Sequence, residues 1–230
     1  MKDQNPGRTP IGVKPLLTIL WAMVLLFSHA TDAQTAYTWN GTVSTDWNNA
    51  QNWTPNGVPV DGDHITIPTS SNIPVMDQAY NLKNVSLNNG NLDLGGYQLT
   101  ATGTVFVTGS GVSNGEFIVN SVDRFTSFSN AVMDAKTDVS TTSILIGNSQ
   151  FNEYTVFNMT PGSFGSISGS GTGGNTFNDS TFFNCSGNGN FYLGQSLPDV
   201  FNGPVSFDIS DAVNFRTAWR GLGNQFNDNI

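Results

Sequence analysis

Apolar and polar residues alternate with period two through the middle of the chain. Between about Tyr80 and Asn120, short apolar-centred runs such as Val85–Leu87, Val105–Val107 and Phe117–Val119 are separated by glycine and asparagine. Residues two apart in a strand face the same side, and glycine and asparagine favour tight turns. No segment of the sequence shows a sustained helical period. The pattern predicts an all-β chain of short strands joined by tight turns.

A phenylalanine–asparagine motif repeats through the C-terminal half. Its members are Phe151-Asn152, Phe157-Asn158, Phe177-Asn178, Phe183-Asn184, Phe201-Asn202, Phe207-Asp208 and Phe226-Asn227. The first phenylalanines of successive units are 26, 24 and 25 residues apart, and Phe125 lies a further 26 residues before Phe151. Repeats of this length are typical of stacked units that bury a face only against their neighbours.

The composition of the repeat selects the kind of stack. Glycine, asparagine, serine and phenylalanine dominate, strong helix formers are scarce, and the leucine framework of a leucine-rich repeat is missing. We therefore predict a parallel, right-handed β-helix (β-solenoid) with coils of about 24–26 residues. Neighbouring coils should be about 4.8 Å apart, so about six coils fit between Tyr80 and Ile230.

The motif also predicts what each side chain does. The phenylalanines should point inward and form an aromatic stack along the axis. The asparagine after each phenylalanine should occupy the bend, adopt left-handed backbone angles and hydrogen-bond to the asparagine one coil away.

A tryptophan-rich segment, residues 34–79, precedes the repeats. Trp39, Trp47 and Trp53 lie close together in the sequence, in a stretch rich in asparagine and glycine. One interpretation is an aromatic cluster that caps the first coil, since tryptophan buries a large apolar area. The other is an exposed platform that, with Trp219, stacks against sugars.

The N-terminal segment, residues 1–33, is predicted to be a signal peptide. A basic leader containing Lys2, Arg8 and Lys14 precedes the apolar run Leu16–Phe27, and small residues follow. We expect cleavage after Ala33, with Ala30 as the alternative position. The run is shorter than the roughly 20 apolar residues of a membrane span, so a signal anchor is the less favoured alternative. The mature chain, residues 34–230, should then contain no transmembrane helix and be secreted or displayed on the outer cell surface.

Charge and cysteine content narrow the classes of partner. The whole chain has a net charge of −9. Such a surface repels phosphate backbones, so no nucleic-acid partner is expected. Cys185 is the only cysteine; an intrachain disulfide is therefore impossible, and the thiol is most simply a small buried residue.

Residues that could support chemistry are few. His64 is the only histidine after the leader, so a nucleophile–histidine arrangement is not expected. Two acidic pairs lie near a basic residue: Asp134 and Asp138 near Lys136, and Asp208 and Asp211 near Arg216. Such pairs can act as acid and base in polysaccharide cleavage, or they can be solvated turn residues. Asp61 and Asp63 are weak candidates for calcium, and no other cofactor is predicted.

The segment Tyr37–Pro74 resembles the opening module of large exported β-helix proteins of Gram-negative gliding-type bacteria. The shared pieces are Trp39-Asn-Gly41, Asp46-Trp47, Asn52-Trp53, Gly57-Val-Pro59, Gly62-Asp63 and Ile65-Thr-Ile67-Pro68. The unit Phe201–Phe207 is similar to the repeat of those proteins. The resemblance implies an adhesin-like surface protein and brings no catalytic residues. It also implies a C-terminal sorting domain, so we expect residues 80–230 to be the repeats of an N-terminal fragment of a longer protein.

The expected function is thus a secreted or surface-displayed structural or adhesive protein without catalytic activity. Its partners would be extracellular glycans or other cell-surface components. The alternative is a carbohydrate-active module that binds through exposed tryptophans or cleaves through the aspartate pairs.

Overall fold

The computed structural model describes residues 34–159, 167–186, 190–210, 214–216 and 223–228. The chain divides into two compact units, Met1–Gln34 and Thr35–Ile230. The predicted signal peptide, residues 1–33, lies outside the described residues.

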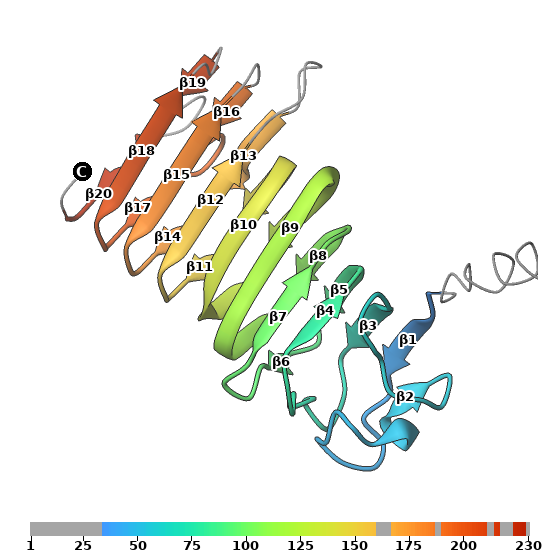
Figure 1. Ribbon diagram of the computed structural model, residues 1–230. Helices are drawn as coiled ribbons and strands as arrows, with labels where there is room; N and C mark the ends of the chain where they lie inside the picture. The colour runs from blue at the N-terminus through green and yellow to red at the C-terminus, as the bar shows by residue number, and fades with distance from the viewer. Residues whose placement is uncertain (1–33, 160–166, 187–189, 211–213, 217–222, 229–230) are drawn as a thin grey trace, which may run out of the picture. The chain divides into compact units, whose positions relative to one another are not determined.

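The strands of the second unit stack in parallel on three faces, which we name A, B and C (Figure 1). Face A contains β4 (Tyr80–Leu82), β7 (Gln98–Ala101), β12 (Thr155–Met159), β15 (Thr181–Ser186) and β18 (Val205–Ser210). Face B contains β6 (Leu92–Asp93), β11 (Gln150–Phe151), β14 (Thr176–Phe177), β17 (Val200–Phe201) and β20 (Gln225–Phe226). Face C contains β1 (Ala36–Trp39), β3 (His64–Pro68), β5 (Asn84–Asn88), β8 (Val105–Thr108), β13 (Ile167–Gly173), β16 (Asn190–Tyr192) and β19 (Asn214–Arg216).

Two long strands, β9 (Gly111–Ser129) and β10 (Val132–Gly147), each bend through all three faces and pair with each other along their length. The chain passes through faces B, A and C in turn, and it completes six coils between Leu92 and Arg216 before β20 begins the next. Among the described residues the only helix is the short 3-10 turn η1 (Ala50–Asn52). The predicted all-β parallel β-helix is confirmed.

Coil length differs between the two halves of the stack. Phe177 lies opposite Phe151, its counterpart in the preceding unit, as the repeat predicts. Phe151 itself lies opposite Met133, and fewer residues separate this pair than separate Phe151 from Phe177. Phe125 lies opposite Ser143 on face C, so its spacing of 26 residues from Phe151 does not place it in line with the later phenylalanines. The earlier coils are shorter because β9 and β10 turn corners by bending, without the loops that separate the later strands.

The core of the later coils contains three phenylalanine stacks, of which the shortest is the pair Phe191 and Phe215 on face C at 5.5 Å. Phe151, Phe177, Phe201 and Phe226 stack at 5.2, 4.8 and 5.0 Å between ring centroids, and Phe157, Phe183 and Phe207 stack at 5.1 and 5.3 Å. These separations match the spacing of paired strands, so strand pairing sets the ring spacing. Rings of different stacks meet edge to face, as Phe177 and Phe183 do at 82°. The aromatic interior that the motif predicts is therefore present.

Asparagine side chains form ladders along the outside of the same coils. Nδ2 of Asn178 donates to Oδ1 of Asn152 at 2.6 Å, and Asn202 and Asn227 continue the ladder at 2.7 Å each. The predicted hydrogen bonds between coils are confirmed. The predicted left-handed angles are not, because positive φ occurs at Asn89, Asn114, Asn130 and Asn148. Asn158 and Asn184 lie within strands, where extended backbone lets their amides stack without a turn.

A second polar ladder lies inside the corner between faces C and B. Asn175 and Asp199 are fully buried, and Oδ1 of Asp199 accepts from the backbone N–H and from Nδ2 of Asn175. Oδ1 of Asn175 in turn accepts from the N–H of Ser149. Buried backbone donors need partners, so these side chains satisfy amides that the turn leaves unpaired.

Candidate functional site

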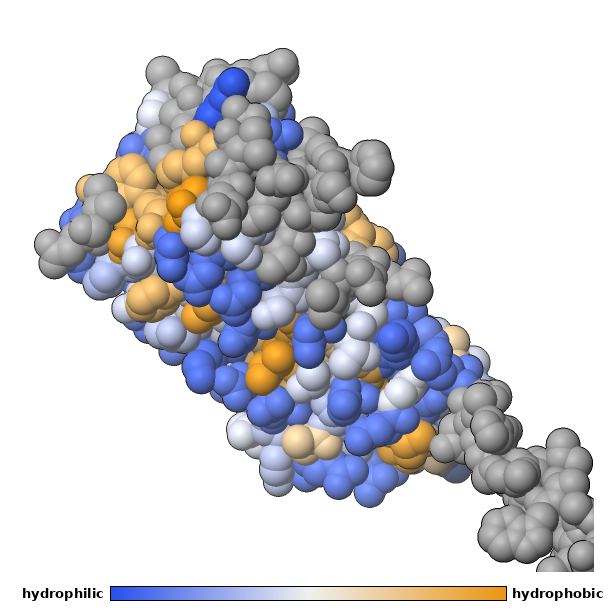
Figure 2. Space-filling model, turned by 45° about the horizontal axis from the view of Figure 1, so that its top comes forward, coloured by the Kyte–Doolittle hydropathy of each residue, from blue (hydrophilic) through white to orange (hydrophobic). Residues whose placement is uncertain are grey.

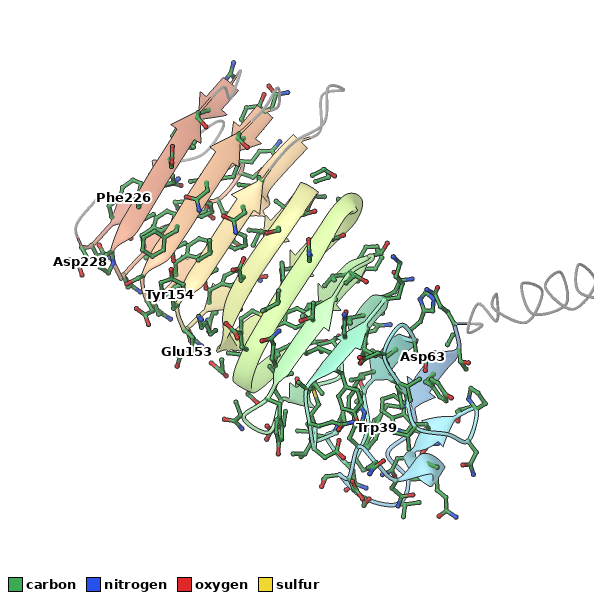
Figure 3. All side chains as sticks on the ribbon, viewed as in Figure 1. Trp39, Asp63, Glu153, Tyr154, Phe226 and Asp228 are labelled. Atoms are coloured by element: carbon green, nitrogen blue, oxygen red, sulfur yellow. The ribbon has the colours of Figure 1, made fainter. Side chains whose placement is uncertain are left out.

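The three tryptophans of the N-terminal segment are buried together, and Figure 3 labels one of them, Trp39. Trp53 lies between Trp39 and Trp47 at centroid distances of 4.9 and 4.8 Å, with its plane nearly perpendicular to both. Trp53 Nε1 donates to the carbonyl oxygen of Trp47, and Trp39 Nε1 donates to that of Asn72. Their exposed fractions are 2% or less, so they form the capping cluster and not an exposed sugar platform. Trp219 lies outside the described residues.

The cap also covers a strand edge. β2 (Trp53–Thr54) pairs antiparallel with β1, whose other edge pairs in parallel with β3. Asn52 holds the intervening loop: its Oδ1 accepts from the N–H groups of Val43 and Ser44, and its Nδ2 donates to Ser44 Oγ. Unpaired edge strands are templates for aggregation, and this arrangement protects one.

The predicted acidic pair on β10 does not form a shared site. Oδ1 of Asp134 accepts from Asn152 and Oδ1 of Asp138 accepts from Asn158, so each carboxylate ends a different asparagine ladder. Lys136 lies between them in sequence but pairs with Glu116 at 2.7 Å. Burial raises the pKa of Asp138 above its ordinary value, with the hydrogen bond from Asn158 acting in the opposite direction.

Of the second predicted acidic pair, Asp208 and Asp211, only Asp208 is among the described residues. Asp208 lies exposed on face A in β18, directly opposite Asn184 in the strand register. Asp211 lies outside the described residues. Arg216 is on face C, with its guanidinium carbon 5.8 Å from the centroid of the Tyr192 ring. The structure therefore places Asp208 and Arg216 on different faces.

The calcium candidates serve the backbone of the first coils. Oδ1 of Asp63 accepts from the N–H of Thr35 and Oδ2 from that of Val60, and Oδ1 of Asp61 accepts from Asn81. His64 hydrogen-bonds through Nδ1 to the Asn84 amide. In the described part of the chain, no three His, Cys, Asp or Glu side chains cluster as metal ligands would.

Cys185 is buried beneath face A, as the sequence suggests. Burial, and secondarily the charge of Asp208, raises the pKa of its thiol from 9.0 to about 12. The neutral thiol is thus favoured in the folded state, and its stabilising contribution should be complete below pH 9.0 and lost as the pH rises toward 12.

Two measurements test this state of Cys185. A thiol-reactive dye at mildly alkaline pH should label it slowly in the folded protein and rapidly in denaturant. The fall in unfolding free energy between pH 9.0 and 12 should be smaller in Cys185→Ala; the comparison is needed because burial also raises the pKa of Tyr80 to about 12. Rapid labelling of the native thiol would contradict the prediction.

Tyr154 and Phe182 lie on the outside of face A, and neither was among the candidate site residues predicted from the sequence. Their ring centroids are 5.3 Å apart, with the ring planes at 41°. Tyr154 is 38% exposed and marks the start of β12 in Figure 3, and Phe182 in β15 is half-buried. Period-two alternation could have found Phe182, because the inward position next to it belongs to Phe183.

Amides and carboxylates occupy the outward positions beyond these rings. Asp138 in β10 lies opposite Val156 and accepts a hydrogen bond from Asn158 Nδ2 at 3.1 Å. Asn158 in β12 lies opposite Asn184 in β15, whose Nδ2 donates to Asn158 Oδ1 at 2.8 Å. Asp208 occupies the equivalent position in β18. A hollow of about 220 Å³ lies here, lined mainly by Asn158, Asn184, Ser186, Asp208 and Ser210. We name Tyr154, Phe182, Asp138, Asn158, Asn184 and Asp208 the aromatic–amide surface.

Face B has an open groove of about 460 Å³ across the first coils. Asp93, Ser113 and Asp134 line it from three successive strands. Its carboxylates are engaged within the fold: Asp93 accepts from the N–H of Gly95 and from Asn114 Nδ2. The groove thus combines hydrogen-bonded carboxylates with the apolar side chains of Ile73, Val75 and Val132.

Residues 38–167 match a protein family described as a domain of unknown function, DUF8693. The match spans more than half of the 230 residues. The chain belongs to the DUF8693 family. The DUF8693 region runs from β1 into β13, so it includes the tryptophan cap, both long strands and Tyr154, whereas Phe182 lies beyond it. No curated protein and no solved structure matches the chain.

No helix among the described residues is long and apolar enough to cross a bilayer.

Proposed function

We propose that this DUF8693 protein is exported and acts at the cell surface, or after secretion, as a structural and adhesive β-solenoid. The observation that supports this role best is the filled interior of the described coils, where stacked phenylalanines and aliphatic residues are packed together. Such coils offer a partner their outer faces, as solenoids commonly do. The basic and apolar leader and the resemblance to large exported β-helix proteins support export.

We further propose that the protein acts by binding and not by catalysis. Supporting this, the carboxylates of Asp134 and Asp138 each accept a ladder hydrogen bond from a different asparagine, although a catalytic pair acts on one shared bond. The face shown in Figure 2 is largely hydrophilic with separate hydrophobic patches, as expected of a surface that stays soluble while presenting local contact sites.

Export is tested by expressing the full chain, with a C-terminal tag, in a Gram-negative host. The expected product lies outside the cytoplasm and begins at Gln34, or at Thr31 if the alternative cleavage position is used. A Leu20→Arg variant, which interrupts the apolar run, should remain unprocessed in the cytoplasm. Wild-type protein retained uncleaved in the cytoplasm would overturn the proposal of export.

Adhesion is tested with beads coated with the purified mature chain. They should be retained on bacterial cells or on extracellular polysaccharide more strongly than beads coated with an unrelated acidic protein of similar charge. Equal retention of both kinds of bead would overturn the adhesive part of the proposal.

A further inference from the structure

We propose that the aromatic–amide surface of face A binds an uncharged polysaccharide chain. This inference rests on the proposed adhesive function and specifies the ligand class and the residues that contact it. The first observation is that two aromatic rings, those of Tyr154 and Phe182, lie outside the buried core. The inward positions of β12 and β15 are already filled by Phe157 and Phe183, which are fully buried, whereas Tyr154 and Phe182 lie outside.

An exposed pair of rings on adjacent coils is a suitable contact for a sugar. Tyr154 and Phe182 expose apolar ring surface to solvent at a cost, and that cost is relieved when the C–H face of a pyranose covers the rings. Strand pairing holds β12 and β15 in register over five residue pairs, so the rings are held on a rigid support. A preorganised surface loses little conformational entropy when it binds a ligand.

The neighbouring side chains supply the polar half of a sugar site. Asn158 and Asn184 provide amide donors and acceptors, and the carboxylates of Asp138 and Asp208 accept hydrogen bonds from hydroxyl groups. Outward residues along a strand are about 6.6–6.8 Å apart, so the amides lie roughly one sugar unit beyond the rings. The hollow of about 220 Å³ between Asn158, Asn184 and Asp208 leaves space for a further unit.

The negative charge of the surface favours an uncharged polysaccharide over an anionic one. Lys136, which lies 5.8 Å from the Tyr154 ring centroid, is already neutralised by Glu116. The surface contributes two carboxylates, and the chain as a whole carries −9. Uronate-containing and sulfated chains are therefore repelled, whereas hydroxyl groups find acceptors. An apolar protein surface would leave the hydrogen-bonding capacity that remains on these amides and carboxylates unsatisfied, so we argue for the glycan.

The experiment uses an array of uncharged glucans, mannans and galactans, with polygalacturonate as the anionic counterpart, and the mature protein. We expect the wild type to bind at least one uncharged chain and not polygalacturonate. The double variant Tyr154→Ser/Phe182→Ser should bind that chain about tenfold more weakly or worse, because aromatic contacts dominate such interfaces. Phe106→Ser is the matched control: Phe106 is 41% exposed and contacts Phe125 at 5.9 Å on face C, so binding should not change.

Three results would overturn the inference: no binding to any uncharged glycan, equal binding by the double variant, or preferred binding to polygalacturonate. A double variant that changes the oligomeric state in light scattering, without a change in glycan binding, would assign the surface to contacts between copies. The bead assay distinguishes a failure of glycan binding at this surface from a failure of the proposed adhesive function. If beads coated with the double variant still adhere as the wild type does, adhesion stands and uses another face.

Discussion

Replacing Phe183 with alanine is expected to lower the free energy of unfolding by about 3–5 kcal/mol. Phe183 is fully buried and stacks between Phe157 and Phe207 at 5.1 and 5.3 Å. Its ring also meets Phe177 edge to face at 82°, and it contacts Phe191 with the ring planes tilted by 48°. Parallel strands hold the rings above and below at their own spacing, so the cavity cannot collapse. Urea denaturation followed by circular dichroism measures the loss.

The adjacent residue is a matched control for this prediction. Phe182→Ala removes the same side chain one position away, on the outside of the same strand, where the ring is half-buried and contacts Tyr154. The stability change should stay within about 1 kcal/mol. Equal losses for the two variants would show that the outer ring supports the fold as much as the core does, and would contradict both this prediction and the assignment of Phe182 to binding.

Replacing Trp53 with alanine is expected to lower the free energy of unfolding by about 3–5 kcal/mol as well, but with a local effect. Trp53 is 2% exposed and lies between Trp39 and Trp47, and its β2 strand covers the free edge of β1. In a stack of coils each unit contacts only its neighbours, so loss of the cap should open the first coils first. Amide hydrogen exchange should accelerate in β1 and β3 while β15 stays protected.

Trp53→Phe separates ring packing from the hydrogen bond. It keeps an aromatic ring in the cluster but removes the Nε1 donor to the Trp47 carbonyl oxygen, so a smaller loss of about 1–3 kcal/mol is expected. A uniform acceleration of exchange along the whole stack in Trp53→Ala would contradict the capping role, because it would mean that the coils unfold as one unit.

The fold could be predicted from the sequence because the place of a residue in the repeat indicates which residue of the next coil it lies opposite. The phenylalanines of one unit lie opposite those of the next, at Phe151 and Phe177 or Phe157 and Phe183, and asparagines keep the same register. Parallel pairing in register places the corresponding residues of successive units above one another, so a regular spacing in the sequence becomes a column in space. Where the repeat is absent, as around Phe125 and Met133, counting residues failed because β9 and β10 turn corners without loops.

The candidate site depended on information that the sequence lacks. By residue type, the tryptophans were reasonable candidates for a sugar platform, and Asp134 and Asp138 were reasonable candidates for a catalytic pair. The tertiary structure buries Trp39, Trp47 and Trp53 in the cap. It places the carboxylates of Asp134 and Asp138 in separate asparagine ladders. It also brings the rings of Tyr154 and Phe182, which belong to different coils, to 5.3 Å on an outer face. The sequence by itself determined the class of fold, the inward residues and the ladder register, since these follow from local alternation and from repetition. Only the tertiary structure decided which polar and aromatic side chains meet on a surface, because coil length and corner geometry set which residues become neighbours across coils.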